Sequence, residues 1–577
     1  MSKKELIIDE IVNKVTDFES NMSSFHQEVN DYSDLFTIKK PAKKSNTFSR
    51  PRTPEMFKAV NALGTMIYRM ITAQDPFFSC KAVDMGASQE SIYRIEKVIQ
   101  VQLRHSQFKR YLLKALMQTA LFGTAIVEET FEWITLNPLG RKIPLTNFIP
   151  RSLLQVGFDR NCYDIDKSDW LYTTDRVSKY NLTNMAKNDA GCGIWSKGDI
   201  QSAIDEKGEE TTNTYILNRL NSSNLNQGVD KASEHMELIM YYGKIDAMND
   251  DVEYVCGLVN RKFLVRFHEN KDQSGRRNFR VGRWIEWELM PQSMGLGKLL
   301  AGHQRSIDAN RQKVETGITF NNLNMWLKDR SAGINSQAFK LIPLKIIEGD
   351  GVNGLKPVET SGVGIQHGLT LDNILKQEFR TASGAIDLFQ AIPTGGTLGE
   401  ASIAQNEGIR NASVKAELIA ESFSRQHLEQ MHINNYTCVG DKFVISGSKG
   451  PEVVYPKDLA VDVDFEITMT TDKNFRPERN KDLINISQIL TSIRNDGLSE
   501  IAKPFIMEMA RNMDIDPKTI EAAYQEQAQK QQAMMEQAAT QAIIKLQNEA
   551  QPVAGGVGKV GVAGQDVPAS SNQPEVI

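Results

Sequence analysis

The stretch KLLAGHQRSIDANRQKVETGITFNNLNMW, residues 298–326, contains the pattern that decides the fold of this 577-residue chain. Leu300, Ile307 and Val314 lie seven residues apart, and Ile318 extends the same apolar stripe. At about 1.5 Å per residue, this spacing predicts one helix of roughly 40 Å. The stripe is narrow, and polar side chains cover the rest of the helix. We therefore expect it to pack against copies of itself or against close neighbours.

A second long helix is predicted at 369–389, and a third runs from about Thr397 to about 435. The glycine-rich residues 327–368 between the first two helices show short strands and turns. This module is too short to separate its flanking helices, so they must lie side by side. The sequence therefore predicts a small β module carried on a stalk of two helices.

The first part of the chain combines an arm, helices and strands. Residues 1–49 are polar, and the predicted structure is a solvated, loosely ordered arm; contact with phosphate or with an acidic neighbouring subunit is the alternative. Its basic residues, with two just beyond it, are Lys39, Lys40, Lys43, Lys44, Arg50 and Arg52. A helix should start at Thr53-Pro54-Glu55, with Thr53 as its N-cap. Further helices are expected at 88–104 and 107–122, the latter ending at Gly123.

Strand patterns occupy 124–290 and return at 437–470. One predicted hairpin turns near Asn260-Arg261, and the polar residues 180–232 predict a partly helical surface insertion. Residues 478–550 have a helical pattern, whereas 551–577 lack one and are expected to be disordered. Together these elements predict an α+β fold.

Composition argues against several classes of protein. The net charge is −5, so the chain as a whole lacks the positive charge typical of nucleic-acid-binding proteins. Any DNA contact must therefore come from local patches. Neither a signal peptide nor a membrane span is expected, and five widely spaced cysteines predict free thiols in a reducing cytosol.

Motifs for catalysis, cofactors or metals are not evident in the sequence. The GxGxxG match at 349–354 is followed by Pro357 rather than a helix, which favours a glycine-rich turn over a dinucleotide site. The aspartates at 159, 164, 166 and 169 lack the glycine and glutamate of an EF-hand loop, and a turn-rich acidic loop is expected. We predict no catalytic residue, no cofactor and no metal.

The order of the elements resembles the portal, or head-to-tail connector, proteins of tailed bacteriophages. Three stretches carry the resemblance: PRSLLQVGFD at 150–159 followed by Asp169-Trp170, PQSMGLG at 291–297 leading to Gln304, Asp308 and Asn310-Arg311-Gln312, and TLGEA at 397–401 with Glu407 beyond. The last stretch departs from the family, because Leu398-Gly399 stands where Ala-Thr is common.

The resemblance implies a portal-like fold whose parts follow the chain. They are a basic arm (1–49), the first part of a wing (50–297), a stem helix (298–326), a clip (327–368), a second stem helix (369–389), a tunnel loop (390–401), a long helix with further wing strands (402–477), a helical crown (478–550) and a tail (551–577). Leu300, Ile307, Val314 and Ile318 are the expected stem-packing residues.

The implied function is structural, not enzymatic. It is a ring of about twelve subunits at one capsid vertex, through which double-stranded DNA is packaged and ejected. Implied partners are the terminase, which supplies the ATPase, major capsid and scaffolding proteins, and tail adaptor proteins. The expected location is the virion after assembly in the host cytoplasm, without membrane contact. The alternatives are another ring or adaptor of a phage tail or baseplate, and a DNA-processing enzyme such as a nuclease or terminase subunit.

The loop between the second and third long helices is the predicted channel loop. Its residues are Pro393, Thr394, Gly395, Gly396, Thr397, Gly399 and Glu400. The glycines admit backbone angles closed to other residues, and Thr397 with Glu400 fits a capping box. The loop contains no lysine or arginine, which suits weak contact with sliding DNA. A connector on the outer surface is the alternative.

Replacing Gly395 and Gly396 with proline should stiffen this loop. We expect ring assembly to continue while less DNA is packaged per capsid, because a rigid loop cannot shift with the passing duplex. Packaged DNA per particle is the measurement, with ring assembly as the control. Unchanged packaging by intact rings would show that the loop is only a connector.

Overall fold

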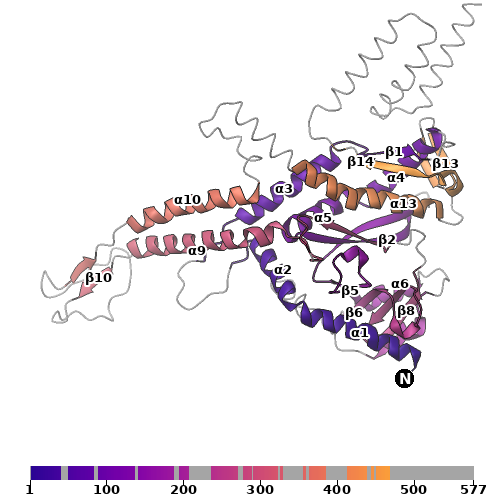
Figure 1. Ribbon diagram of the computed structural model, residues 1–577, viewed down its shortest axis with the longest axis horizontal. Helices are drawn as coiled ribbons and strands as arrows, with labels where there is room; N and C mark the ends of the chain where they lie inside the picture. The colour runs from indigo at the N-terminus through magenta and orange to yellow at the C-terminus, as the bar shows by residue number, and fades with distance from the viewer. Residues whose placement is uncertain are drawn as a thin grey trace, which may run out of the picture. The chain divides into compact units, whose positions relative to one another are not determined.

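The computed structural model (Figure 1) describes part of the chain. The described residues are 2–40, 50–83, 89–136, 141–187, 194–206, 235–270, 277–288, 290–322, 325–328, 355–358, 363–384, 412–437, 443–447, 450–467 and 469. The chain divides into two compact units, Met1–Glu478 and Arg479–Ile577, and every described residue belongs to the first. The predicted tunnel loop (390–401), crown (478–550) and tail (551–577) lie outside the described residues.

Three helices form as the sequence predicts: α3 (Glu55–Thr72), α4 (Gln89–His105) and α5 (Phe108–Phe122). Gly123 ends α5 with a φ of 90°, a conformation that glycine adopts without steric cost. The start of α3 differs from the prediction, because Pro54 rather than Thr53 is at the N-cap position and no side chain of that residue caps the helix.

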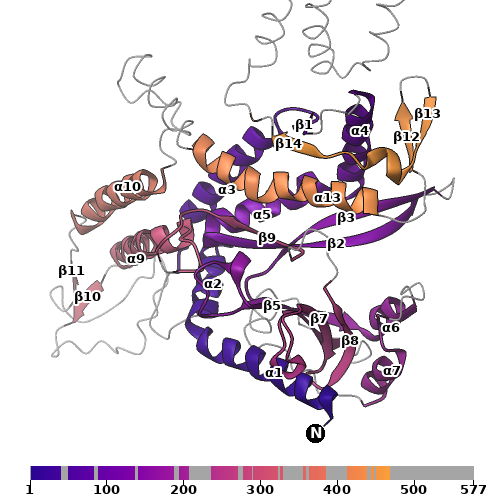
Figure 2. The same cartoon turned by 45° about the vertical axis from the view of Figure 1, so that its right-hand side comes forward.

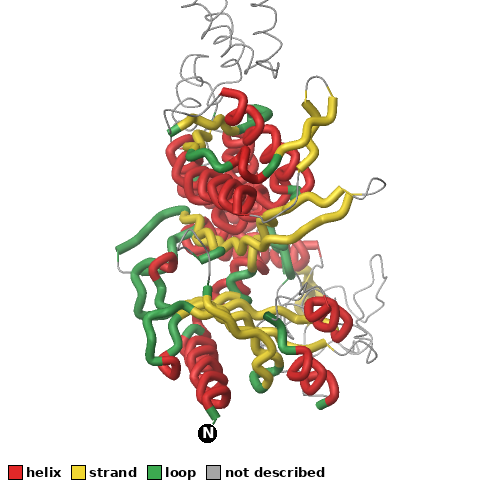
Figure 3. Tube along the Cα trace, turned by 90° about the vertical axis from the view of Figure 1, so that its right-hand side faces the viewer, coloured by secondary structure: helices red, strands yellow, loops and turns green. Residues whose placement is uncertain are grey.

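A three-stranded antiparallel sheet separates two hydrophobic cores. Its order is β3-β2-β9, with bounds Arg141–Arg151, Thr124–Leu136 and Phe279–Arg283. Successive strand residues point to opposite faces. Accordingly, Val127 packs in the core with the helices, whereas Ile126 packs in the core that contains the second sheet. Figure 3 shows this arrangement, with helices and the second sheet on opposite sides.

The second sheet is five-stranded and antiparallel, in the order β4-β5-β6-β7-β8. The strands are Val156–Phe158, Trp170–Ser178, His235–Gly243, Tyr254–Val259 and Phe263–Glu269. Asn260 and Arg261 have positive φ, so the predicted hairpin turn is confirmed. Helices α6 (Lys179–Lys187) and α7 (Lys197–Asp205) confirm that the insertion is partly helical. Short 3-10 turns occur at Ile165–Lys167 and Asp246–Met248.

The prediction of a loosely ordered N-terminal arm is wrong for residues 3–36, which form α1 (Lys3–Asn21) and α2 (Ser23–Phe36). Ser2 and Glu5 form a capping box at the start of α1. One face of α1 then buries a stripe against the second core, namely Ile7, Ile11, Val15 and Phe18. Figure 2 shows α1 beside the five-stranded sheet. Polar composition hid this stripe, whose helical spacing is visible in the sequence.

The predicted stalk consists of two helices with a strand pair between them. Helix α9 spans Leu296–Asn322 and α10 spans Val363–Ser383, so the second helix begins earlier in the chain than expected. Between them, β10 (Met325–Lys328) pairs antiparallel with β11 (Leu355–Val358). Figure 1 shows α9 and α10 side by side, with β10 at their far end. We call the two helices α9 and α10 the stem.

The chain returns to the body after the stem. Residues 412–437 are helical, with a π-helical turn at Glu421–Arg425 followed by α13 (Gln426–Thr437). The predicted returning strands are present: β12 (Phe443–Gly447) pairs with β13 (Gly450–Val454), and β14 (Val463–Ile467) pairs with β1 (Phe78–Ala82). A 3-10 turn occupies Pro456–Leu459.

The described part of the chain therefore has a mixed α and β fold, with helices and antiparallel sheets in separate layers. Cys80, Cys162 and Cys256 are free thiols in this part. Across the residues that the structure describes, no helix combines the length and apolarity needed to span a bilayer.

Gly123→Ala tests the junction between α5 and the stem. A Cβ here would overlap the backbone of Ser293 and Gly295, in addition to the positive φ. Backbone atoms cannot yield as a flexible side chain does, so we expect a loss of about 2–4 kcal/mol in unfolding free energy. The matched control is Gly302→Ala on α9, where a Cβ meets nothing within 4 Å. Chemical denaturation of the full chain measures both, and equal stability of the two variants would contradict the close approach.

Candidate functional site

The stem is the candidate site, and its predicted packing residues divide into two groups. Leu300 and Ile307 are completely buried in the core that α9 shares with the body. Val314 is also buried, but against α10. Ile318 remains 40% exposed. Of the two alternatives expected for the stripe, copies of the chain or close neighbours, Leu300 and Ile307 therefore pack against close neighbours, because the chain's own body buries them.

The two stem helices make a close contact in the middle of α9. A Cβ on Gly368 would lie 2.5 Å from Cγ2 of Val314, so the valine occupies the space that the missing side chain leaves. Asn310 reinforces the contact, since its Nδ2 donates to the carbonyl oxygen of Gly368 at 2.8 Å. Gly317 similarly lies opposite Ile365. The glycines thus allow the backbones of α9 and α10 to approach each other closely.

An ionic cluster supports the same helix pair on its polar side. Asp372 of α10 is only 3% exposed. It pairs with Lys376 at 2.7 Å and faces the guanidinium of Arg311 on α9 at 3.8 Å. Arg311 also faces Glu315 at 3.4 Å. These charges connect the helices and fix the position of Arg311.

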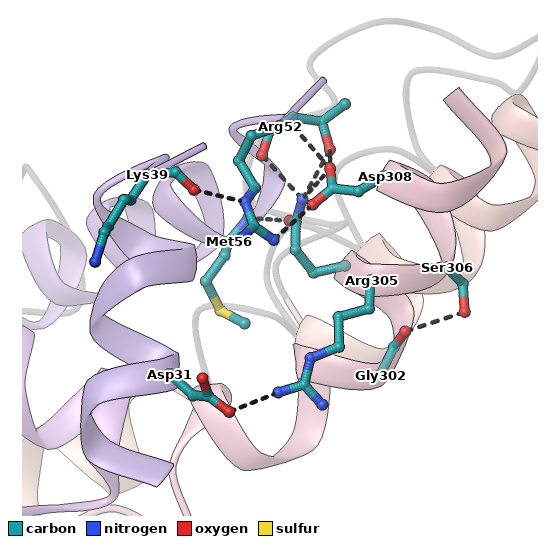
Figure 4. Close-up of polar contacts among 10 residues, drawn as sticks. Asp31, Lys39, Arg52, Met56, Gly302, Arg305, Ser306 and Asp308 are labelled. Atoms are coloured by element: carbon teal, nitrogen blue, oxygen red, sulfur yellow. Dashed lines mark hydrogen bonds and ion pairs between the residues drawn. The ribbon is translucent and has the colours of Figure 1, made fainter. Parts of the chain in front are cut away.

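The body end of the stem is attached by Asp308, whose contacts Figure 4 shows. Its carboxylate accepts hydrogen bonds from the backbone N–H of Thr53 at 2.8 Å and from the Thr53 hydroxyl at 3.0 Å. It also forms an ion pair with Arg52 at 3.0 Å, and both side chains are largely buried. We call Arg52, Thr53, Gln304 and Asp308 the stem anchor.

Gln304 completes the stem anchor by capping α3. Its Oε1 accepts the backbone N–H of Met56 at 3.0 Å, and its Nε2 donates to the carbonyl oxygen of Thr53 at 2.9 Å. The start of α3 therefore obtains its cap from another helix, which explains why Thr53 does not serve as the N-cap. Gln304 and Asp308 lie four residues apart, and that spacing on one helix is the signal that could have identified the anchor.

The first turn of α9 packs against α2. Gly297 lies against the ring of Tyr32, and a Cβ there would come within 2.8 Å of that ring. Burial and the neighbouring Glu28 raise the pKa of Tyr32 to about 12, so the phenol stays neutral. Arg305 of α9 pairs with Asp31 of α2 at 3.1 Å, as Figure 4 shows. Both side chains are exposed. Helix α2 thus belongs to the support of the stem.

Large apolar side chains are exposed along the stem. They are Leu299 and Ile318 on α9 and Leu369, Leu371 and Ile374 on α10, each 40–48% exposed. At about 100° per residue, Leu371 and Ile374 share one side of α10. Neighbouring exposed apolar side chains such as these two are typical of a contact with another molecule.

The other candidates from the sequence do not form a site. Arg283 pairs with both Asp164 and Asp166, which leaves that loop neutralised by protein rather than arranged around an ion. Among the residues that the structure describes, no cluster of three or more side chains could hold a metal. Strand β11 directly follows the GxGxxG match, so the prediction that no helix follows it is confirmed. The channel loop residues from Pro393 to Glu400 lie outside the described residues.

One buried polar cluster was not predicted. His427 Nδ1 lies 2.7 Å from Glu129, which also pairs with Arg280 at 2.8 Å, and all three side chains are almost completely buried. The His427 ring stacks on Phe108 with a centroid distance of 5.0 Å. This cluster joins the three-stranded sheet to α13, far along the sequence.

Neither family models nor curated proteins match the chain in sequence. The geometry of the stem and its surroundings is therefore the basis for a functional proposal.

Asp308→Ala should strongly destabilise the fold. The change leaves the largely buried guanidinium of Arg52 without its carboxylate, and breaking such a pair costs about 3–5 kcal/mol. The control is Arg305→Ala, which removes an exposed pair on the same helix and should cost under about 1 kcal/mol. Denaturation of the full chain followed by tryptophan fluorescence gives both values. Comparable stabilities of the two variants would rule out the stem anchor as a major contribution.

Proposed function

We propose that the chain is a portal protein subunit, and one observation carries the proposal. Two long antiparallel helices project from an α and β body, are joined at their far end by a strand pair, and expose apolar side chains along their length. In this proposal the body is the wing, α9 and α10 form the stem, and β10 with β11 belongs to the clip.

The exposed stem residues support assembly into a ring. Leu371 and Ile374 are nearly half exposed, and Ile318 continues a stripe whose other members are buried. Burial of apolar surface contributes about 25 cal/mol per Å². Stems placed side by side around an axis would bury these residues in every copy, and a heterologous contact of that kind forms a ring when its rotation closes.

The attachment of the stem to the body supports the same proposal. The stem anchor and the buried residues Leu300 and Ile307 hold the first half of α9 firmly in the body. A stem that must keep its angle in every copy of a ring requires such a support. The proposed function is passage of double-stranded DNA at a capsid vertex, with the terminase, capsid, scaffolding and tail adaptor proteins as partners. The location in the virion follows from this proposal.

Two other classes predict different behaviour in solution. Another ring or adaptor of a phage tail or baseplate would also oligomerise, but it would not replace a portal in a packaging reaction. A DNA-processing enzyme would cleave DNA or hydrolyse ATP. Mass measurement, particle images and a packaging reaction on the full chain therefore distinguish the three.

Leu371→Glu with Ile374→Glu should prevent ring assembly while the fold persists. Both residues are exposed in the single chain, so the unfolding free energy should change by about 0.5 kcal/mol or less. Between packed stems, however, two carboxylates would be buried without partners. We expect closed rings from the wild-type chain and monomers from the variant, as measured by light scattering and negative-stain images.

The matched control is Gln366→Glu with Asn373→Glu, which adds the same charge to another side of α10, about 120° from the side of Leu371 and Ile374. Both residues are exposed. This control should still form rings. Rings from the Leu371 and Ile374 variant would exclude the exposed stem face as the subunit contact, and a monomeric wild-type chain would overturn the proposed function.

A further inference from the structure

A basic cleft lies next to the stem anchor. It has a volume of about 570 Å³, and four basic side chains line it with a single carboxylate. Lys40, Arg50 and Arg52 come from the segment before α3, whereas Arg311 and Glu315 come from α9. Residues far apart in sequence thus bring their positive charges to one place in a chain whose net charge is −5.

Arg52 and Arg311 are paired with carboxylates. Arg52 pairs with Asp308 at 3.0 Å and donates from Nε to the carbonyl oxygen of Lys39 at 3.1 Å. Arg311 is fixed between Glu315 and Asp372. Lys40 is exposed, and Arg50 adds a further guanidinium to the same wall. The cleft therefore combines two guanidinium groups paired with carboxylates, the partly buried Arg50 and the exposed ammonium group of Lys40.

The lining favours phosphate groups over a protein surface. Apart from the aliphatic stems of the basic residues, prolines 51 and 54 are its apolar components, so a protein partner would find little apolar area to bury. Guanidinium groups match the geometry of phosphate oxygens and can form two parallel hydrogen bonds with them. The predicted channel loop contains no lysine or arginine and cannot supply such contacts.

We propose that this cleft binds the phosphodiester backbone of double-stranded DNA through Lys40, Arg50 and Arg311. The inference rests on the proposed function and names where the chain contacts the DNA that passes it. The contact is independent of base sequence, because phosphates carry no sequence information. It is also electrostatic, so counterions replace the protein as the salt concentration rises.

The test compares two double variants of the full chain. Lys40→Gln with Arg50→Gln removes two positive charges from the cleft. Lys81→Gln with Arg104→Gln removes the same two charge types from β1 and α4, where both side chains are 65% exposed. Binding of a short labelled DNA duplex is followed by fluorescence anisotropy between about 50 and about 200 mM salt. Ring formation is measured separately on each preparation.

The expected result is a smaller salt dependence for the cleft variant alone. The slope of log affinity against log salt should fall by about 0.9 for each lost phosphate contact, hence by about 1.8 for both. The control should keep the wild-type slope. Identical slopes for both variants, or no duplex binding by the wild-type chain, would overturn the inference.

Two further outcomes separate this inference from the proposed function. If the cleft variant keeps its DNA affinity but no longer forms rings, the cleft contacts a second copy of the chain and the inference is wrong. If the wild-type chain forms no rings, the proposed function fails, whereas the salt slopes still decide whether the cleft binds DNA.

Discussion

The ion pair between Arg52 and Asp308 determines how the stem is attached to the rest of the molecule. Asp308 is in the first half of α9, where Leu300 and Ile307 already belong to the core of the body. The same carboxylate holds Thr53, and Gln304 one turn earlier caps α3. One turn of α9 therefore fixes both the angle of the stem and the start of α3. A buried ion pair of this kind contributes little net free energy of folding, but removing one partner is strongly destabilising. Its main effect is therefore to hold the two helices in one relative position.

Beyond this turn, α9 packs against α10. Val314 against Gly368 and Asp372 beside Arg311 hold the pair together, but Ile318, Leu371 and Ile374 remain exposed. Two helices packed on each other cannot bury all the apolar residues that they carry, and these three side chains are left partly uncovered in the described part of the chain. The two stem helices thus pack on each other, but part of their apolar surface stays exposed. This exposed surface is the physical basis for proposing that other copies of the chain cover the stem.

Periodicity predicted the helices and most strands, because those signals are local. The strand-rich region, the hairpin turn at Asn260-Arg261 and the end of α5 at Gly123 followed from residues close to one another in sequence. The identity of the packing partners could not be predicted from such local signals. The spacing of Leu300 and Ile307 shows that they are buried, but not that the chain's own body buries them. Likewise, α1 was missed because four apolar residues are diluted by polar neighbours, and its stability comes from the distant five-stranded sheet.

The stem anchor and the basic cleft share Arg52, and this sharing follows from electrostatics. A guanidinium held by Asp308 loses little freedom when a ligand arrives, so the cost of ordering it is already met by folding. Arg311 is fixed in the same way by the carboxylates of the stem. The carboxylates that stabilise the stem also weaken the positive potential of these two guanidinium groups, and Lys40 and Arg50 add positive charge to the same cleft. Under the proposed function, such a site would bind phosphates weakly enough for the duplex to move past the chain.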